Sequence, residues 1–353
     1  MLTNLFAFIA SALLTLIITP YIRKAALKIG AVDDPSEDAR KKHRKIMPRG
    51  GGIAIVISFI LLATLLLPAQ PSRTFWGVVL ASLLVFLVGL WDDIRRLSPW
   101  AKLIVQVIAA LIAILGFGLS TDVINNPLGQ QIDLTVWKID VFSTTLSVWS
   151  VVFSLLWLVG MTNTINFLDG LDGLATGISA IAAFVLYFIS ISPNINQPDT
   201  AILALILLGA CIGFLRYNFN PAKIFLGDSG AYFLGFMLAS LALISGAKLA
   251  TALLVLGVPI FDAVWSVIRR LAKGKSPFRA DRGHFHYMLL DAGFSQRAAV
   301  LIMYALAMIF GIVALIGSGK DKAYGLFILV GFIITAFIWL SLRISRRRAM
   351  HQK

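Results

Sequence analysis

The stretch GGIAIVISFILLATLLLP, residues 51–68, contains no charged side chain. A run of this length is about long enough to cross a hydrocarbon core near 30 Å thick as an α-helix. The composition of the whole chain agrees, because 59% of its 353 residues are hydrophobic, 14% are charged and the mean hydropathy is +0.88. Soluble domains have a charged fraction of about 25%. The sequence therefore predicts a membrane protein.

Apolar runs like this one recur along the whole chain, separated by short polar loops. No internal repeat or low-complexity linker is visible, so we predict a single all-α polytopic membrane domain over residues 1–353. The lone cysteine, Cys211, excludes an internal disulfide. We count eleven candidate spans, at residues 2–20, 51–68, 75–90, 103–119, 146–162, 174–191, 200–215, 230–245, 249–265, 298–317 and 323–342.

Lysine and arginine are distributed unevenly between alternate loops. With eleven spans, the loops and tail of one side hold 26 of the 31 basic residues. The positive-inside rule places that side in the cytoplasm, with the N-terminus outside and the C-terminus cytoplasmic. The net charge of +14 is then a one-sided charge that attracts anionic membrane lipids, and no nucleic-acid partner is expected. On the opposite side, the alternating stretch QIDLTVWKID, residues 131–140, predicts a small hairpin.

Acidic and amide side chains gather at the cytoplasmic ends of the predicted spans. The clearest case is NTINFLDGLDGLA, residues 163–175, in which Asn163, Asn166, Asp169 and Asp172 follow one another at intervals of three. No lysine or arginine lies among them, and two glycines indicate that the helix breaks there. Charges so close to hydrocarbon are costly unless they are paired or functional. Because all these ligands are oxygens, the stretch favours a hard cation such as Mg²⁺ or Mn²⁺.

Two other acidic motifs also stand at the ends of spans. The adjacent Asp92 and Asp93 lie in GLWDDIRRLSPWAK, which ends at Lys102. Asp228 lies in FLGDSG, immediately before an apolar run. The residue pattern alone leaves open whether each of these carboxylates caps a helix or binds a cation.

Basic residues suited to phosphate occur in two of the cytoplasmic loops. In the first loop a cluster ends at Arg49 and is followed by three glycines, which let backbone approach a ligand closely. A face that binds lipid headgroups explains most of this cluster, and it leaves His43, Lys45 and Arg49 as candidates for contacting an anionic substrate.

The second basic loop contains the sequence DRGHFH, which includes Arg282, His284 and His286. Two histidines at positions i and i+2 do not share a helix face, so a helical zinc site is not expected. An arginine and histidine cluster is better suited to holding phosphate.

In this order and on alternate sides of predicted spans, these motifs resemble the polyprenyl-phosphate N-acetylhexosamine-1-phosphate transferases. The similarity runs from about Asp33 to Gly293 and rests on Asp92–Asp93, NTINFLDGLDGLA, NPAKIFLGDSG and DRGHFH. It implies an eleven-span enzyme of the bacterial cytoplasmic (inner) membrane with its active site on the cytoplasmic side. Such an enzyme transfers a sugar-1-phosphate from a UDP-sugar to undecaprenyl phosphate and releases UMP, the first membrane step of a cell-envelope polysaccharide such as lipopolysaccharide or teichoic acid.

The loop DRGHFHYML is more similar to the branch that uses UDP-N-acetylglucosamine (UDP-GlcNAc). In the branch that uses UDP-N-acetylmuramoyl-pentapeptide (UDP-MurNAc-pentapeptide), three histidines are consecutive, whereas Phe285 and Tyr287 interrupt such a run here. We therefore expect a GlcNAc-1-phosphate transferase, with the peptidoglycan enzyme as the alternative. A secondary transporter is a distant alternative, because its acids would lie near mid-span in related halves.

The resemblance also implies a role for each motif residue. Asp228 and Asn166 match metal-binding positions for Mg²⁺ or Mn²⁺, and Lys102 matches a lysine that binds substrate phosphate. The implied catalytic residues are Asp92, Asp93, Lys102 and Asp228. The implied substrate-binding residues are Lys45, Asn163, Asp169, Asp172, Arg282, His284 and His286. We expect loops 21–50, 91–102, 163–173, 216–229 and 266–297 to form the active site, and a homodimer is left open.

The predicted orientation can be checked by cysteine labelling. Single cysteines at Lys138 and Ser276, introduced in a Cys211→Ser background, should differ when intact cells receive a membrane-impermeant thiol reagent. Because position 138 is predicted outside and position 276 inside, the reagent should label 138 and spare 276. The opposite labelling pattern would invert the topology.

Overall fold

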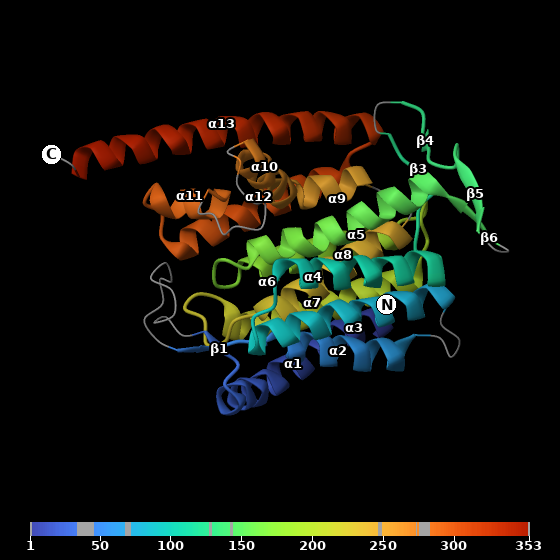
Figure 1. Cartoon of the computed structure of the whole chain (residues 1–353), viewed down its shortest axis with the longest axis horizontal. Coiled ribbons are helices and arrows are strands. Elements are labelled where there is room, and N and C mark those ends of the chain that lie inside the picture. Colours follow the sequence, from blue (N-terminus) through green and yellow to red (C-terminus); the bar gives the residue numbers. More distant parts are fainter. Residues whose placement is uncertain are drawn as a thin grey trace.

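Long α-helices that lie side by side make up most of the computed structural model (Figure 1). The structure describes residues 2–33, 46–67, 72–126, 129–141, 144–245, 249–272, 274 and 283–351. The helices are α1 (Leu2–Ile29), α2 (Gly52–Leu66), α3 (Arg73–Ile94), α4 (Pro99–Leu111) with a π-helical turn (Ile112–Gly116), α5 (Val148–Leu168), α6 (Leu174–Ser190), α7 (Pro198–Asn218), α8 (Gly227–Ile244), α9 (Leu249–Val255), α10 (Gly257–Ala272), α11 (Phe285–Asp291), α12 (Gln296–Ile316) and α13 (Gly319–His351).

Membrane-spanning helices are the dominant feature of the fold. Within the described residues, eight helices are long and apolar enough to cross a membrane, and α2 and α6 are shorter apolar helices. The all-α polytopic class predicted from the sequence is therefore confirmed. Each predicted apolar run overlaps a helix, although the run 249–265 is divided between α9 and α10 by a turn at Leu256. The number of eleven spans and the orientation of the termini stay predictions.

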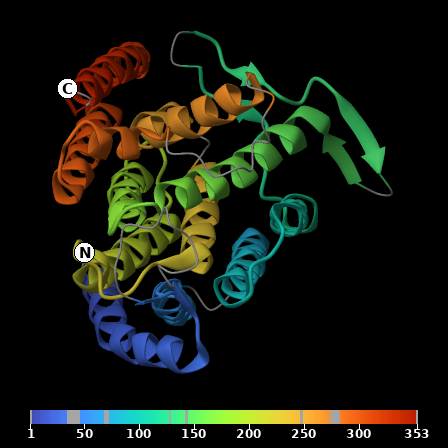
Figure 2. The same cartoon turned by 60° about the vertical axis from the view of Figure 1, so that its left-hand side comes forward.

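Helix α8 is the central helix of the bundle. The most apolar part of α8 is 89% buried, a larger share than in any other long helix, and α8 packs against α2, α3, α5 and α6. Figure 2 shows these helices gathered around it. The closest approach to α3 is at Gly89, where a Cβ atom would lie 2.6 Å from the carbonyl oxygen of Asp228. Only glycine lets α3 pass so near the start of α8.

The predicted cytoplasmic loops meet at one end of the bundle. The backbone N–H groups of Gly51 and Gly52 donate to the carbonyls of Phe225 and Leu226, at 3.0 and 2.9 Å. The glycines after the first basic loop thus bring its backbone against the backbone that precedes α8. The prediction that backbone here approaches a ligand stays a prediction.

Side chains join the remaining loops to the same end. Arg297 Nε donates to the carbonyl of Asn220 at 3.0 Å, and the Tyr287 hydroxyl donates to the carbonyl of Gly170 at 3.4 Å. The break predicted after α5 is confirmed, because Gly173 has a φ of +79° just before α6 begins. A left-handed residue of this kind lets the chain reverse between two antiparallel helices.

Short antiparallel strands form two pairs at the opposite end, and a third pair joins β1 (Val32–Asp33) to β2 (Met47–Pro48). The stretch 131–140 contains β4 (Ile132–Asp133) and the start of β5 (Lys138–Val141), but these strands do not pair with each other. The hairpin predicted within that stretch is therefore wrong. The Asp133 carboxylate accepts from the N–H of Thr135 at 2.7 Å, which turns the chain away after β4. The partners are β3 (Val123–Ile124) for β4 and β6 (Thr144–Ser147) for β5.

Candidate functional site

A polar cluster around Asp228 lies where α3, α4, α5 and α8 meet. Lys102 Nζ donates to Asp92 Oδ2 at 3.1 Å and to Asp228 Oδ2 at 3.0 Å. Asn166 Nδ2 donates to Asp228 Oδ1 at 3.0 Å, and the Tyr232 hydroxyl donates to Asp228 Oδ2 at 3.2 Å. Four motif residues that are far apart in the sequence therefore share one site, as the resemblance implies.

Asp93 faces a different partner from its neighbour Asp92. The Asp93 carboxylate accepts from the backbone N–H groups of Asp228 (2.9 Å) and Ser229 (3.2 Å) and from the Ser229 hydroxyl (2.6 Å). These N–H groups belong to the first turn of α8, which has no capping side chain of its own. Gly227 has a φ of +78°, and a Cβ atom there would collide with the Asp93 carboxylate. Asp93 thus caps α8 from another helix and sets the position of Asp228.

The loop between α5 and α6 contributes Asp169 and Asp172. Burial, followed by the nearby charges of Asp228 and Asp93, raises the pKa of Asp169 well above its usual range. The positive charge of Arg49 acts in the opposite direction. Several carboxylates therefore repel one another here, and the site favours an added positive charge.

Asp172 lies outside the Asp228 cluster in the described contacts. One carboxylate oxygen, Oδ2, accepts from Asn220 Nδ2 at 2.8 Å and from the N–H of Ala222 at 3.0 Å. Asp172 thereby ties its loop to the segment that leads into α8.

Asn163 lies one turn further into the bundle than Asn166. Its Nδ2 atom donates to Gln106 Oε1 at 2.7 Å and to the carbonyl of Val159 at 2.8 Å. Gln106 is buried on α4 one turn after Lys102, and the sequence motifs did not identify it. Asn163 and Gln106 form a buried pair beneath the cluster.

His284 and His286 lie at the start of α11. His284 has extended backbone and precedes the helix, so its ring stacks on that of His286, with centroids 5.7 Å apart and planes at 12°. His286 is fully buried, and within the described part of the chain neither of its ring nitrogens has a hydrogen-bond partner. Burial is the main cause that lowers the pKa of His286 to about 4. The ring is therefore neutral near pH 7 and has one donor and one acceptor for a ligand.

The His286 side chain also lies beside the α5–α6 loop. A Cβ atom on Gly170 would lie 2.8 Å from His286 Nε2 and 2.5 Å from the Tyr287 hydroxyl. The start of α11 therefore reaches the segment that carries Asp169. Lys45 and Arg282, the other two residues predicted to bind substrate, lie outside the described residues, as does His43.

The donor atoms of this site suit a hard cation that shares its coordination with a ligand. Asp92 and Asp228 provide carboxylate oxygens, and rotating the Asn166 amide would place its oxygen beside Asp228. Over the described ranges, no group of three histidine, cysteine or acidic side chains forms a complete metal site. Mg²⁺ commonly binds through one or two carboxylates together with substrate phosphates and water.

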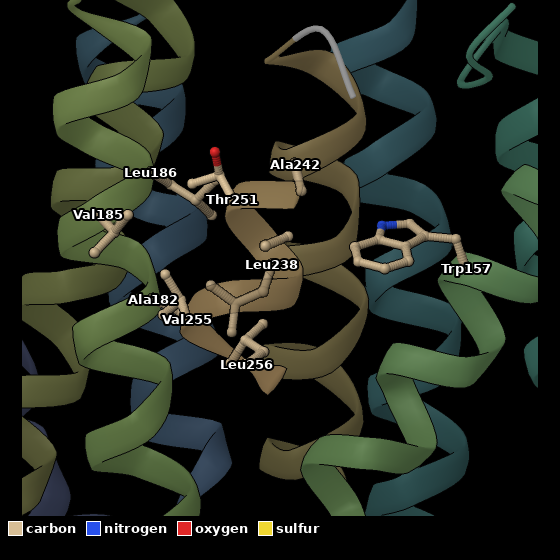
Figure 3. A pocket seen from close by; sticks show the side chains of 10 residues that line it. Trp157, Ala182, Val185, Leu186, Leu238, Ala242, Thr251, Val255 and Leu256 are labelled. Atoms are coloured by element: carbon tan, nitrogen blue, oxygen red, sulfur yellow. The ribbon is translucent and has the colours of Figure 1, made fainter. Parts of the chain in front are cut away.

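An apolar pocket lies elsewhere, between α5, α6, α8 and α9 (Figure 3). Trp157, Leu186, Leu238 and Leu256 are among the side chains that line it. Leu238 is ten residues after Asp228 on the same helix, which corresponds to about 15 Å along its axis. The polar cluster and this pocket are therefore separate features of α8.

Comparisons with known proteins agree with the geometry of the site. Residues 75–246, which include Asp92, Asn166 and Asp228, match the model of glycosyl transferase family 4. The chain is 36% identical to the probable undecaprenyl-phosphate N-acetylglucosaminyl 1-phosphate transferase of Bacillus subtilis (strain 168), over 94% of this chain and 89% of that protein. The chain belongs to glycosyl transferase family 4.

Two other relatives show the breadth of this family. The decaprenyl-phosphate N-acetylglucosaminephosphotransferase of Mycolicibacterium smegmatis is 33% identical over 84% of this chain and 77% of its own length. The phospho-N-acetylmuramoyl-pentapeptide-transferase of Limosilactobacillus reuteri is 29% identical over 89% of this chain and 97% of its own length. The family-4 chain is thus a multi-pass membrane enzyme that transfers a sugar-1-phosphate, as the motifs predict.

Substitutions of the adjacent Asp92 and Asp93 should have different effects on the stability of the protein. Asp93→Asn turns an amide N–H₂ toward the N–H and hydroxyl donors of α8, and an unsatisfied buried group costs about 1–3 kcal/mol. Asp92→Asn leaves the cap intact. In thermal unfolding of the purified protein in detergent, Asp93→Asn should melt several degrees below both wild type and Asp92→Asn. Equal melting temperatures for the two variants would contradict the capping role of Asp93.

Proposed function

We propose that this enzyme transfers GlcNAc-1-phosphate from UDP-GlcNAc to undecaprenyl phosphate. The products are undecaprenyl-diphospho-GlcNAc and UMP, in the first membrane step of a cell-envelope polysaccharide. The reaction occurs on the cytoplasmic side of the bacterial inner membrane, where UDP-sugars are found and where the predicted loops carry most of the basic residues.

The convergence of Asp92, Lys102, Asn166 and Asp228 at the loop end of the bundle is the observation that carries this proposal. Phosphoryl transfer depends mainly on positioning and on neutralising charge, and this cluster has groups for both tasks. The lipid phosphate would meet it close to the membrane interface without its charge crossing hydrocarbon.

The acceptor phosphate needs little help to become a nucleophile. A phosphate monoester has a second pKa near 6, so most molecules are dianions at pH 7. Lys102 donates from the middle of the cluster and is placed to bind this phosphate, while Asp92 accepts a proton from the remaining monoanion. Attack on the phosphorus atom next to the sugar forms one P–O bond and breaks the bond to UMP.

Charge repulsion between the two substrates is the larger obstacle. Asp228 and Asn166, with Asp92 nearby, have the oxygen atoms to hold Mg²⁺ or Mn²⁺. A divalent cation bound there would neutralise phosphate oxygens and polarise the phosphoryl group. Asp169, Asp172 and Lys45 are assigned to the nucleotide, and the loop that contains Arg282, His284 and His286 is assigned to the diphosphate and sugar. The buried nitrogens of His286 give the donor a hydrogen-bonding position without adding charge.

The choice of sugar rests on the loop that contains His284 and His286. Phe285 is buried in the core and Tyr287 contacts the α5–α6 loop, so neither position holds a histidine ligand. The higher identity to the named GlcNAc-phosphate transferases, at 36% and 33% against 29%, supports the same donor. UDP-MurNAc-pentapeptide is the alternative.

A panel of nucleotide sugars tests the donor directly. Purified enzyme with undecaprenyl phosphate should release UMP from UDP-GlcNAc and transfer radiolabel from that sugar into lipid. UDP-MurNAc-pentapeptide should be a poor donor, because the site lacks the consecutive histidines of that branch. A preference for the pentapeptide donor would overturn the proposal, and an absence of transfer from either donor would count against the reaction class.

Removal of the divalent cation should stop turnover. Exhaustive chelation should abolish UMP release, and added Mg²⁺ or Mn²⁺ should restore it. Asp228→Asn should lower kcat by at least about 100-fold, as expected when a charge-stabilising group is lost, while the protein still folds. The matched control is Asp199→Asn, an acid in the first turn of α7 outside the cluster, which should keep the wild-type rate. Full activity after chelation would contradict the metal assignment.

A further inference from the structure

A second polar cluster lies on one face of α10, beside the start of α11. Asp262, Ser266 and Arg270 are spaced by four residues, so all three point from α10 toward the same neighbour. Asp262 is 3% exposed and Arg270 is 5% exposed. Their shared partner is His284, the residue that precedes α11.

Both oxygen atoms of Asp262 are used in this contact. Oδ2 lies 2.9 Å from His284 Nδ1, and Oδ1 accepts from the backbone N–H of Phe285 at 2.8 Å. On the far side of the ring, His284 Nε2 lies 3.2 Å from an amino group of Arg270 and 3.5 Å from the Ser266 hydroxyl. Asp262 therefore both orients the imidazole and caps the start of α11.

The hydrogen-bond partners of His284 favour one of its tautomers. A guanidinium group can only donate, so Nε2 must accept from Arg270 and carries no proton. The remaining proton is on Nδ1, where it is donated to the Asp262 carboxylate. A protonated imidazole would turn an N–H toward the arginine, which disfavours that form, and the charges of Asp262 and Arg270 lie on opposite sides of the ring.

We propose that Asp262 is a positioning residue for the transfer reaction. By holding His284 in its neutral Nδ1–H form, it fixes the ring on which His286 stacks and keeps the nitrogens of His286 in place for the donor's diphosphate. His284 is then held between Asp262 and Arg270 and supports the His286 ring by stacking on it. His286 is the ring that contacts the ligand. The inference rests on the proposed function for the identity of the donor. It gives the two histidines different roles, with His284 orienting His286 and His286 contacting the donor.

The tautomer of His284 can be measured without any substrate. Wild-type protein labelled with ¹⁵N at its four histidines should show a neutral His284 with its proton on Nδ1. The resonance is assigned by its absence in His284→Ala. A proton on Nε2, or a protonated ring at pH 7, would overturn the proposal, and this result does not depend on whether UDP-GlcNAc is the donor.

Kinetics of Asp262→Asn distinguish positioning through His284 from simple helix capping. The amide keeps an oxygen for the N–H of Phe285 but turns an N–H₂ toward Nδ1, so both ring nitrogens of His284 then face donors and the ring must lose one of its two contacts. We expect kcat/KM for UDP-GlcNAc to fall about 10–100-fold, the usual range for residues that orient a binding group. In a His284→Ala background the same substitution should have almost no further effect, because its partner is gone.

The comparison variants complete this test. Asp199→Asn, the same chemical change at an exposed helix start, should leave kcat/KM unchanged. Wild-type kinetics in Asp262→Asn, or losses that multiply fully in the double variant, would show that Asp262 does not act through His284. If wild type does not use UDP-GlcNAc, the proposed function fails, and the ¹⁵N measurement still decides whether the network exists.

Discussion

The hydrogen bonds from the first turn of α8 to Asp93 are the interaction on which the rest of the site depends. A helix N-terminus carries unpaired N–H groups and partial positive charge, and a buried carboxylate satisfies both. Because Asp93 belongs to α3, the cap joins two helices that pass closely at Gly89. Asp228 follows directly from this cap, so its position is set by backbone and does not depend on a flexible side chain. Hydrogen bonds from Lys102, Asn166 and Tyr232 then orient the Asp228 carboxylate.

The cluster around Asp228 and the cluster around His284 differ in how their charges are compensated. Around Asp228, burial and then the charges of Asp228 and Asp93 raise the pKa of Asp169, so an added positive charge would be favourable there. At the start of α11, Asp262 and Arg270 lie on opposite sides of the His284 ring. The first cluster would therefore be stabilised by an added positive charge, whereas in the second the opposite charges already lie on either side of His284. The α5–α6 loop lies between them, in contact with His286 and Tyr287 at Gly170.

The sequence was sufficient to predict the membrane fold, since the apolar runs depend only on local composition. It also predicted the helix break before α6 and the grouping of Asp92, Asn166 and Asp228. The sequence could not distinguish the role of Asp92 from that of Asp93, because adjacent residues on a helix differ only in the direction in which their side chains point. Asp262 was missed because it lies inside an apolar run, although the polar spacing of Asp262, Ser266 and Arg270 was a readable signal. The hairpin pairing failed because local alternation does not specify a partner strand.

The central claim is that Asp228 is where the cation and the donor diphosphate meet. Electron paramagnetic resonance of Mn²⁺ bound to the purified enzyme with UDP-GlcNAc tests this claim most directly, because ³¹P hyperfine coupling reports phosphate bound to the metal. The account predicts clear ³¹P coupling in wild type and its loss in Asp228→Asn, with the Asp199→Asn protein unchanged. Equal Mn²⁺ affinity and equal ³¹P coupling in Asp228→Asn would contradict it.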